Sequence, residues 1–106
     1  MSDIETSLLS VKEALFDNNI IKSFLELNEQ IKKDETIQNL LKSQKDAQHK
    51  MCKFVDNDEQ YLKYKNDFIN CSKQLESNPL YANFMNVKEE AFSLLEEVKE
   101  ALEWLL

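Results

Sequence analysis

The sequence predicts an all-α protein, an antiparallel bundle of about four to five helices that ends in a long C-terminal helix. Three observations predict this fold class. The 106 residues contain no Gly, which tight hairpin turns favour, and one Pro, and these are the two residue types that most weaken helices. Apolar side chains recur at steps of three and four residues, which is the spacing of one helix face. Short runs of Asn and Asp, which favour caps and turns, interrupt this pattern.

Length and composition predict a single helical domain over residues 1–106. Chains of roughly 100–150 residues usually form one domain. Apolar residues make up 42% of the chain, which is enough for a hydrophobic core, and charged residues make up 31%.

The first two predicted helices are separated by an Asp-Asn-Asn sequence at residues 17–19. We expect the first helix to run from Ile4 to Phe16 and the second to end at Lys33, because Lys favours a helix C-terminus. Each carries an apolar stripe at helical spacing, formed by Ile4, Leu8, Val11 and Leu15 in the first and by Ile20, Phe24, Leu27 and Ile31 in the second.

The third and fourth predicted helices form an antiparallel hairpin around the Asp-Asn-Asp sequence at residues 56–58. Asp34 suits the N-cap of the third helix, with Glu35 in its first turn. The apolar stripe of the third helix holds Ile37, Leu40, Leu41, Gln44, Ala47, Met51 and Phe54, and that of the fourth holds Tyr61, Tyr64, Phe68, Cys71 and Leu75.

The last predicted helix begins at Pro79, after an N-cap at Asn78, and continues to Leu106. A helix of this length measures about 42 Å. A compact domain of this size has a diameter of roughly 33 Å, so the helix is expected to extend beyond its own domain. Its apolar seam alternates steps of four and three residues through Leu80, Phe84, Val87, Ala91, Leu94, Val98, Ala101 and Leu105.

The apolar end of this helix predicts a protein interface. Trp104 could fold back onto the first helix of its own chain, or it could contact a second copy or another protein, and the spacing alone leaves both open. We expect self-association, since aromatic side chains in exposed apolar patches often anchor interfaces. Replacing Leu95 or Trp104 with Glu should then give a smaller particle. The interface is predicted at Phe84, Phe92, Leu95, Leu102, Trp104 and Leu105.

The net charge of −7 is concentrated at the two ends of the chain. Nucleic acids and anionic membrane surfaces attract clustered positive charge, so both are poor partners for this sequence. The longest uncharged run has 11 residues, between Glu76 and Lys88, whereas a membrane-spanning helix needs about 20. The N-terminus is polar and acidic, unlike a signal peptide, and a cytoplasmic location is expected. The Glu-rich back of the last helix is either a solvated face or a docking surface for a basic partner.

Residue types that carry catalysis or bind cofactors are sparse, and we expect no enzyme activity, no cofactor and no metal. His49 is the one His and lies off the apolar stripe, which predicts an ordinary solvated side chain. Cys52 and Cys71 could form a disulfide, a metal pair or buried thiols. In the predicted hairpin they are offset by about 15 Å along the helices, too far for a bridge. Cys71 is expected in the core and Cys52 partly exposed.

The layout resembles the YlbF/YmcA-like family of small helical bacterial proteins over nearly the whole chain. The resemblance rests on a short first helix, the Asn-Ile-Ile-Lys-Ser-Phe sequence at 19–24 and the Asp-Glu cap at 34–35. It rests further on the Leu-Glu-Ser-Asn-Pro-Leu junction at 75–80 and the Leu-Leu-Glu-Glu-Val sequence at 94–98. The resemblance implies an all-α fold, helix-mediated oligomers and a regulatory role without catalysis.

Better-known members of that family act in protein complexes that influence RNA processing, competence, sporulation and biofilm formation. Some of those complexes hold iron–sulfur clusters through Cys residues, but Cys52 and Cys71 do not match those ligands. The expected function is therefore a regulatory adaptor that forms a homo-oligomer, a dimer or tetramer, and docks onto other regulatory proteins. The alternatives are a small-molecule or metal-binding helical bundle, and an acidic decoy that occupies a nucleic-acid-binding surface on another protein.

Overall fold

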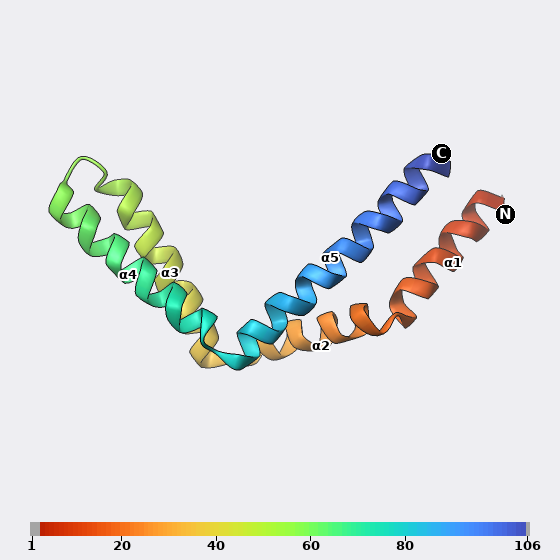
Figure 1. Ribbon diagram of the computed structural model, residues 1–106, viewed down its shortest axis with the longest axis horizontal. Helices are drawn as coiled ribbons and strands as arrows, with labels where there is room; N and C mark the ends of the chain where they lie inside the picture. Colours follow the sequence, from red (N-terminus) through yellow and green to blue (C-terminus); the bar gives the residue numbers. More distant parts are fainter. Residues whose placement is uncertain (1–2, 106) are drawn as a thin grey trace. The chain divides into compact units, whose positions relative to one another are not determined.

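The computed structural model describes residues 3–105, with the side chain of Leu105 left out, and contains five α-helices (Figure 1). Within these residues there is no β-strand, so the predicted all-α fold class with a long C-terminal helix is confirmed. The helices lie within a residue or two of the predicted bounds: α1 (Asp3–Asp17), α2 (Asn19–Lys33), α3 (Glu35–Lys53), α4 (Asp58–Glu76) and α5 (Pro79–Leu105).

Asn and Asp side chains begin four of the helices, as the sequence predicts. The Asn18 Oδ1 accepts a hydrogen bond of 2.8 Å from the Ile20 N–H at the start of α2. The Asp34, Asn57 and Asn78 side chains make the equivalent bonds at α3, α4 and α5, with N···O distances of 2.9, 3.1 and 3.1 Å. Each bond satisfies a backbone donor that has no partner within the first helical turn.

The described residues fall into two compact units. Unit 1 takes residues 3–28 and 84–105, and unit 2 takes Glu29–Asn83. The boundaries cross α2 and α5, so each of these helices contributes to both units. The single domain predicted over residues 1–106 stays a prediction.

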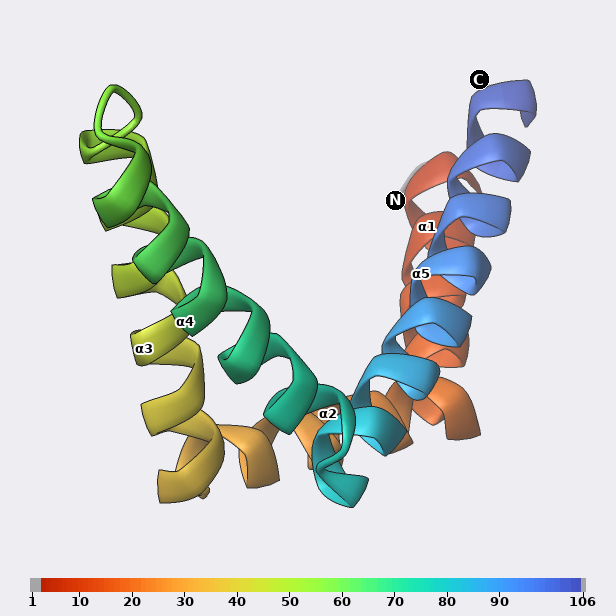
Figure 2. The same cartoon turned by 60° about the vertical axis from the view of Figure 1, so that its left-hand side comes forward.

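Unit 2 is built on the antiparallel hairpin of α3 and α4, which lie side by side in both views (Figures 1 and 2). Ile37, Ala47 and Leu75 are buried between them, as their places on the apolar stripes predict. Phe54 caps α3 and stacks on Tyr64, with ring centroids 5.6 Å apart. The Gln44 amide donates to the Ser72 hydroxyl at 2.9 Å, and this bond between the helices fixes their register.

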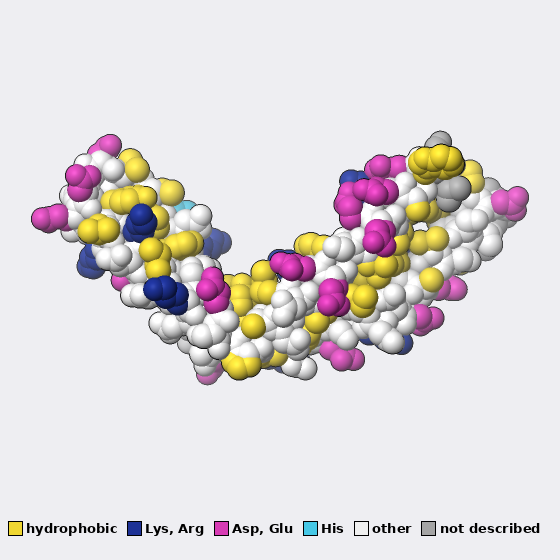
Figure 3. All heavy atoms as spheres, viewed as in Figure 1, with side chains coloured by type: hydrophobic (Ala, Val, Ile, Leu, Met, Phe, Trp, Pro, Cys, Tyr) yellow, Lys and Arg dark blue, Asp and Glu magenta, His cyan; other side chains and the backbone are white. Residues whose placement is uncertain are grey.

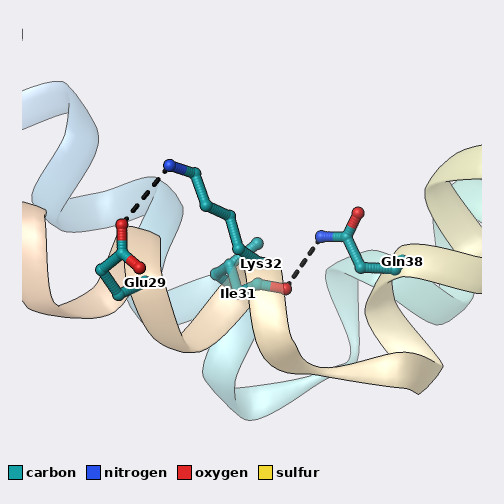
Figure 4. A network of polar contacts seen from close by, with 4 residues as sticks. All are labelled: Glu29, Ile31, Lys32 and Gln38. Atoms are coloured by element: carbon teal, nitrogen blue, oxygen red, sulfur yellow. Dashed lines mark hydrogen bonds and ion pairs between the residues drawn. The ribbon is translucent and has the colours of Figure 1, made fainter.

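Polar side chains also fix the turn from α2 to α3 within unit 2 (Figure 4). The Ile31 carbonyl, in the last turn of α2, accepts hydrogen bonds from the Gln38 amide at 2.8 Å and from the Asp34 N–H at 3.2 Å. Beside it, the Lys32 ammonium lies 3.4 Å from the Glu29 carboxylate. The turn is therefore held by the Gln38 bond to the end of α2 and by the Asp34 cap at the start of α3.

Unit 1 combines α1, the first part of α2 and most of α5. Its core is aromatic: Phe84 stacks on Phe24 with ring centroids 5.8 Å apart, and Phe92 contacts the same ring at 5.9 Å. Ile21 and Ala91 are buried beside them. Both views show α1 running alongside the C-terminal half of α5 (Figures 1 and 2).

Candidate interaction surfaces

Helix α1 forms the stripe that the sequence predicts, but unit 1 covers only part of it. None of its described residues is buried. Val11 and Leu15 are half-buried, whereas the remaining large apolar side chains of the helix are exposed, namely Ile4, Leu8, Leu9 and Phe16. An amphipathic helix gains most of its stability by packing its apolar face, so α1 presents a face suited to further contact.

The seam of α5 is progressively less covered toward its C-terminal end. Ala91 is fully buried, Leu94 and Val98 are half-buried, and Ala101 is exposed. Trp104 follows with 90% of its surface accessible. The possibility that Trp104 folds back onto the first helix of its own chain is therefore wrong, because that contact would cover the indole ring.

Helix α5 presents exposed apolar side chains on two different faces within unit 1. Lys88, Phe92, Leu95 and Lys99 follow one another at steps of four, three and four residues and share one face. Phe92 and Leu95 are 52% and 40% exposed, and the Lys88 ammonium lies 5.5 Å from the centre of the Phe92 ring. We call this the Phe92 face.

Trp104 lies on the opposite side of the helix. It comes nine residues after Leu95, which is two and a half turns at about 3.6 residues per turn. Counted back from Trp104, the same side carries Glu97, Ser93 and Asn86. This side of α5 is acidic, and Figure 3 shows Asp and Glu side chains gathered along the helix beside hydrophobic ones.

A shallow groove runs along this acidic side within unit 1. Ile20, at the start of α2, and Leu94 are its apolar members, and both are half-buried. The groove has a volume of about 630 Å³. We call it the acidic groove; it is lined by Ile20, Asn86, Glu89, Glu90, Ser93, Leu94 and Glu97.

The six predicted interface residues thus occupy different places. Phe84 is part of the aromatic core and is buried within its own chain. Phe92 and Leu95 are exposed on the Phe92 face, and Leu102 is half-buried. Trp104 is exposed on the side of the acidic groove. The Leu105 side chain lies outside the described part of the structure. Periodicity could place all six on a broad apolar face, but it could not show which of them the chain itself covers.

The residues considered for catalysis or metal binding all lie in unit 2. His49 and Cys52 are exposed, as predicted, and both cysteines are free thiols. Cys71 is half-buried where a core position was expected, because it borders a polar hollow of about 290 Å³ between α3 and α4. Among the described residues, no three His, Cys, Asp or Glu side chains are grouped so as to hold a metal ion.

An ion pair between two residues of α3 lines the polar hollow. The Lys50 ammonium lies 3.2 Å from the Asp46 carboxylate and 5.2 Å from the centre of the Tyr64 ring. The hydrogen bond to Asp46 and its charge, followed by the charges of Tyr64 and Asp67, raise the pKa of Lys50 above its ordinary value. Lys50 therefore stays charged at neutral pH and at moderately alkaline pH.

The comparison with protein families identifies the group to which these helices belong. The family model described as control of competence regulator ComK, YlbF/YmcA, matches residues 4–104. The chain belongs to the YlbF/YmcA family. The resemblance seen in the sequence is confirmed, and the match to this YlbF/YmcA protein spans α1 through nearly all of α5.

The family description assigns YlbF/YmcA proteins a regulatory role, the control of a competence regulator. No curated protein and no solved structure matches the chain. In the described part of this YlbF/YmcA protein, none of the helices combines the length and the apolar character that a membrane span requires.

Proposed function

We propose that this YlbF/YmcA protein is a non-enzymatic regulatory adaptor that self-associates through α1 and the Phe92 face and docks onto other regulatory proteins. The single observation that supports this proposal best is α1, a helix of 15 residues in which no described side chain is buried. Isolated helices of about 12–15 residues are marginal in water, so α1 gains stability if a second molecule covers its apolar face.

The exposed apolar side chains of unit 1 supply the surface for that contact. Besides those of α1, they include Leu25 on α2 and Phe92 and Leu95 on α5. Burying a Leu or Phe side chain contributes about 1.5–3 kcal/mol, so a few such side chains suffice for a stable pair of helices. A second copy and a partner regulatory protein could use different parts of this surface.

In this proposal the adaptor acts within a protein complex that influences RNA processing, or competence and biofilm development, by bringing partner proteins together. Both the family description and the exposed surfaces support a role in protein contacts. Catalysis has no part in it, and the partners are proteins.

The proposal is tested by the mass of the purified protein at about 10 μM, measured by light scattering during gel filtration. The wild type should exceed the monomer mass of 12.5 kDa, and Leu95→Glu should shift it toward the monomer, since a buried unpaired charge opposes association. The matched control is Leu62→Glu, the same change at an exposed position of unit 2, which should leave the mass unchanged. A wild type that already runs as a monomer at this concentration would contradict self-association.

A further inference from the structure

The whole net charge of the protein resides in unit 1. This unit holds eleven acidic and four Lys side chains, whereas unit 2 holds nine of each. On α5 the two Lys side chains of unit 1 lie on the Phe92 face, so the side that carries the acidic groove has Glu side chains without an intervening Lys. The groove therefore lies in the most negative part of the chain.

The acidic groove combines this charge with apolar anchor points. Ile20 and Leu94 are half-buried within it, and the side chains of Glu89, Glu90 and Glu97 are exposed around them. Trp104 follows Glu97 by seven residues, two turns farther along the same side of α5. From Asn86 to Trp104 this strip measures about 27 Å, the length of a helix of about 18 residues.

We propose that the acidic groove and Trp104 together bind a basic amphipathic helix of a partner protein. Lys or Arg side chains on its flanks pair with the Glu side chains, and its apolar face covers Ile20, Leu94 and the Trp104 indole. This inference deepens the proposed function and depends on it, since it names the class of partner that the adaptor docks onto.

The negative charge of the acidic groove disfavours the other ligands that it could bind. A second copy that placed its own acidic groove here would set Glu side chains against Glu side chains, and like charges facing each other across an interface oppose binding. Nucleic acid is repelled for the same reason. A metal ion has no site here, because the described Glu side chains of the groove are not grouped closely enough to hold one. A helix with both Lys and Leu side chains complements the groove in charge and in apolar character.

Trp104 is the one Trp of the chain, so tryptophan fluorescence reports on contacts at the C-terminal end of the proposed binding strip. The probe is a synthetic helical peptide of about 18 residues, without aromatic residues, that carries Leu on one face and Lys on both flanks. On titration into the full-length protein, the emission of Trp104 should move to shorter wavelength and saturate as the indole leaves water. A peptide of the same pattern with Glu in place of Lys should give no shift.

Variants separate the groove from the general charge of unit 1. Exchanging Glu90 and Glu97 together for Lys should weaken binding of the Lys/Leu peptide about tenfold or more, as attraction turns into repulsion at two positions. The matched control exchanges Glu13 and Glu26, which are exposed in the same unit but do not line the groove. It changes the net charge equally and should weaken binding by about twofold or less, because distant exposed charges are screened at ~0.15 M salt.

Several results would overturn the inference. It is wrong if the Glu/Leu peptide binds as well as the Lys/Leu peptide, or if both double variants weaken binding equally. It is also wrong if the Trp104 emission shifts with protein concentration in the absence of peptide, since a second copy then occupies the groove. Light scattering on the same samples measures self-association independently of peptide binding. If the protein exceeds the monomer mass but does not bind the Lys/Leu peptide, the inference about the groove is wrong and the proposed self-association still stands.

Discussion

At the scale of single residues, the helix breaks of this chain are set by Asn and Asp side chains that accept hydrogen bonds from the following turn. Asp34 is the clearest case, because its backbone is extended and its Oδ1 accepts from the Ile37 N–H at 2.9 Å. Glu35 in the first turn of α3 adds a favourable charge at the helix N-terminus. These bonds explain why the sequence alone located the helix starts so closely.

Asp34→Ala is expected to lower the free energy of unfolding by about 1 kcal/mol, since a backbone donor at the start of α3 loses its partner. Urea denaturation followed by circular dichroism measures the change. Asp34→Asn is the control, because the amide oxygen can still accept the bond, and it should lose clearly less. Equal losses for Ala and Asn would show that the charge of Asp34 matters and its capping bond does not.

At the scale of helices, the sequence predicted which elements form but not which faces the chain covers. All five helices were predictable because apolar spacing and capping residues act locally within each segment. The positions of Ile20 and Ile21 show the limit: the stripe pointed to Ile20, yet Ile21 is buried and Ile20 lines the acidic groove. Neighbouring apolar residues fit a helical stripe equally well, and the packing of α5 against α2 decides between them.

The candidate surface was predictable in part for the same reason. The wide apolar face of α5 was visible in the sequence, and the exposure of Trp104 and Leu95 agrees with it. The burial of Phe84 against Phe24 was not visible, because it depends on a contact between segments 60 residues apart. The acidic groove has no signal of its own in the sequence beyond the Glu-rich back of the last helix.

The hairpin of α3 and α4 allows a matched test of how burial stabilises one helix. Leu75 and Leu62 both lie in α4, and they are 2% and 56% exposed. Leu75→Ala should lower the free energy of unfolding by about 2–5 kcal/mol, because it leaves a cavity between the helices. Leu62→Ala should stay within about 0.5 kcal/mol of the wild type, as exposed substitutions usually do. Thermal and urea unfolding measure both, and similar losses would contradict the packing of the hairpin.

At the scale of the whole molecule, the net negative charge and the most closely packed helices belong to different units. Unit 2 is electrically neutral and contains the closely packed hairpin, whereas unit 1 carries the charge of −7 together with the uncovered faces of α1 and α5. Like charges held close together destabilise a compact state, and dissolved salt screens them. The stability of unit 1 should therefore depend on a bound partner or on ionic strength, whereas the stability of unit 2 should not.

Raising the NaCl concentration from about 0.1 M to about 1 M shortens the screening length from about 10 Å to about 3 Å. Hydrogen exchange read by mass spectrometry should then slow in α1 and in the C-terminal half of α5, with little change in α3 and α4. Replacing Glu13 and Glu100 with Gln removes two negative charges from unit 1 and should reduce the salt response while leaving the exchange of unit 2 as it was. Equal slowing in both units would mean that salt acts through general apolar burial, and the uneven distribution of charge would then have no part in the stability of unit 1.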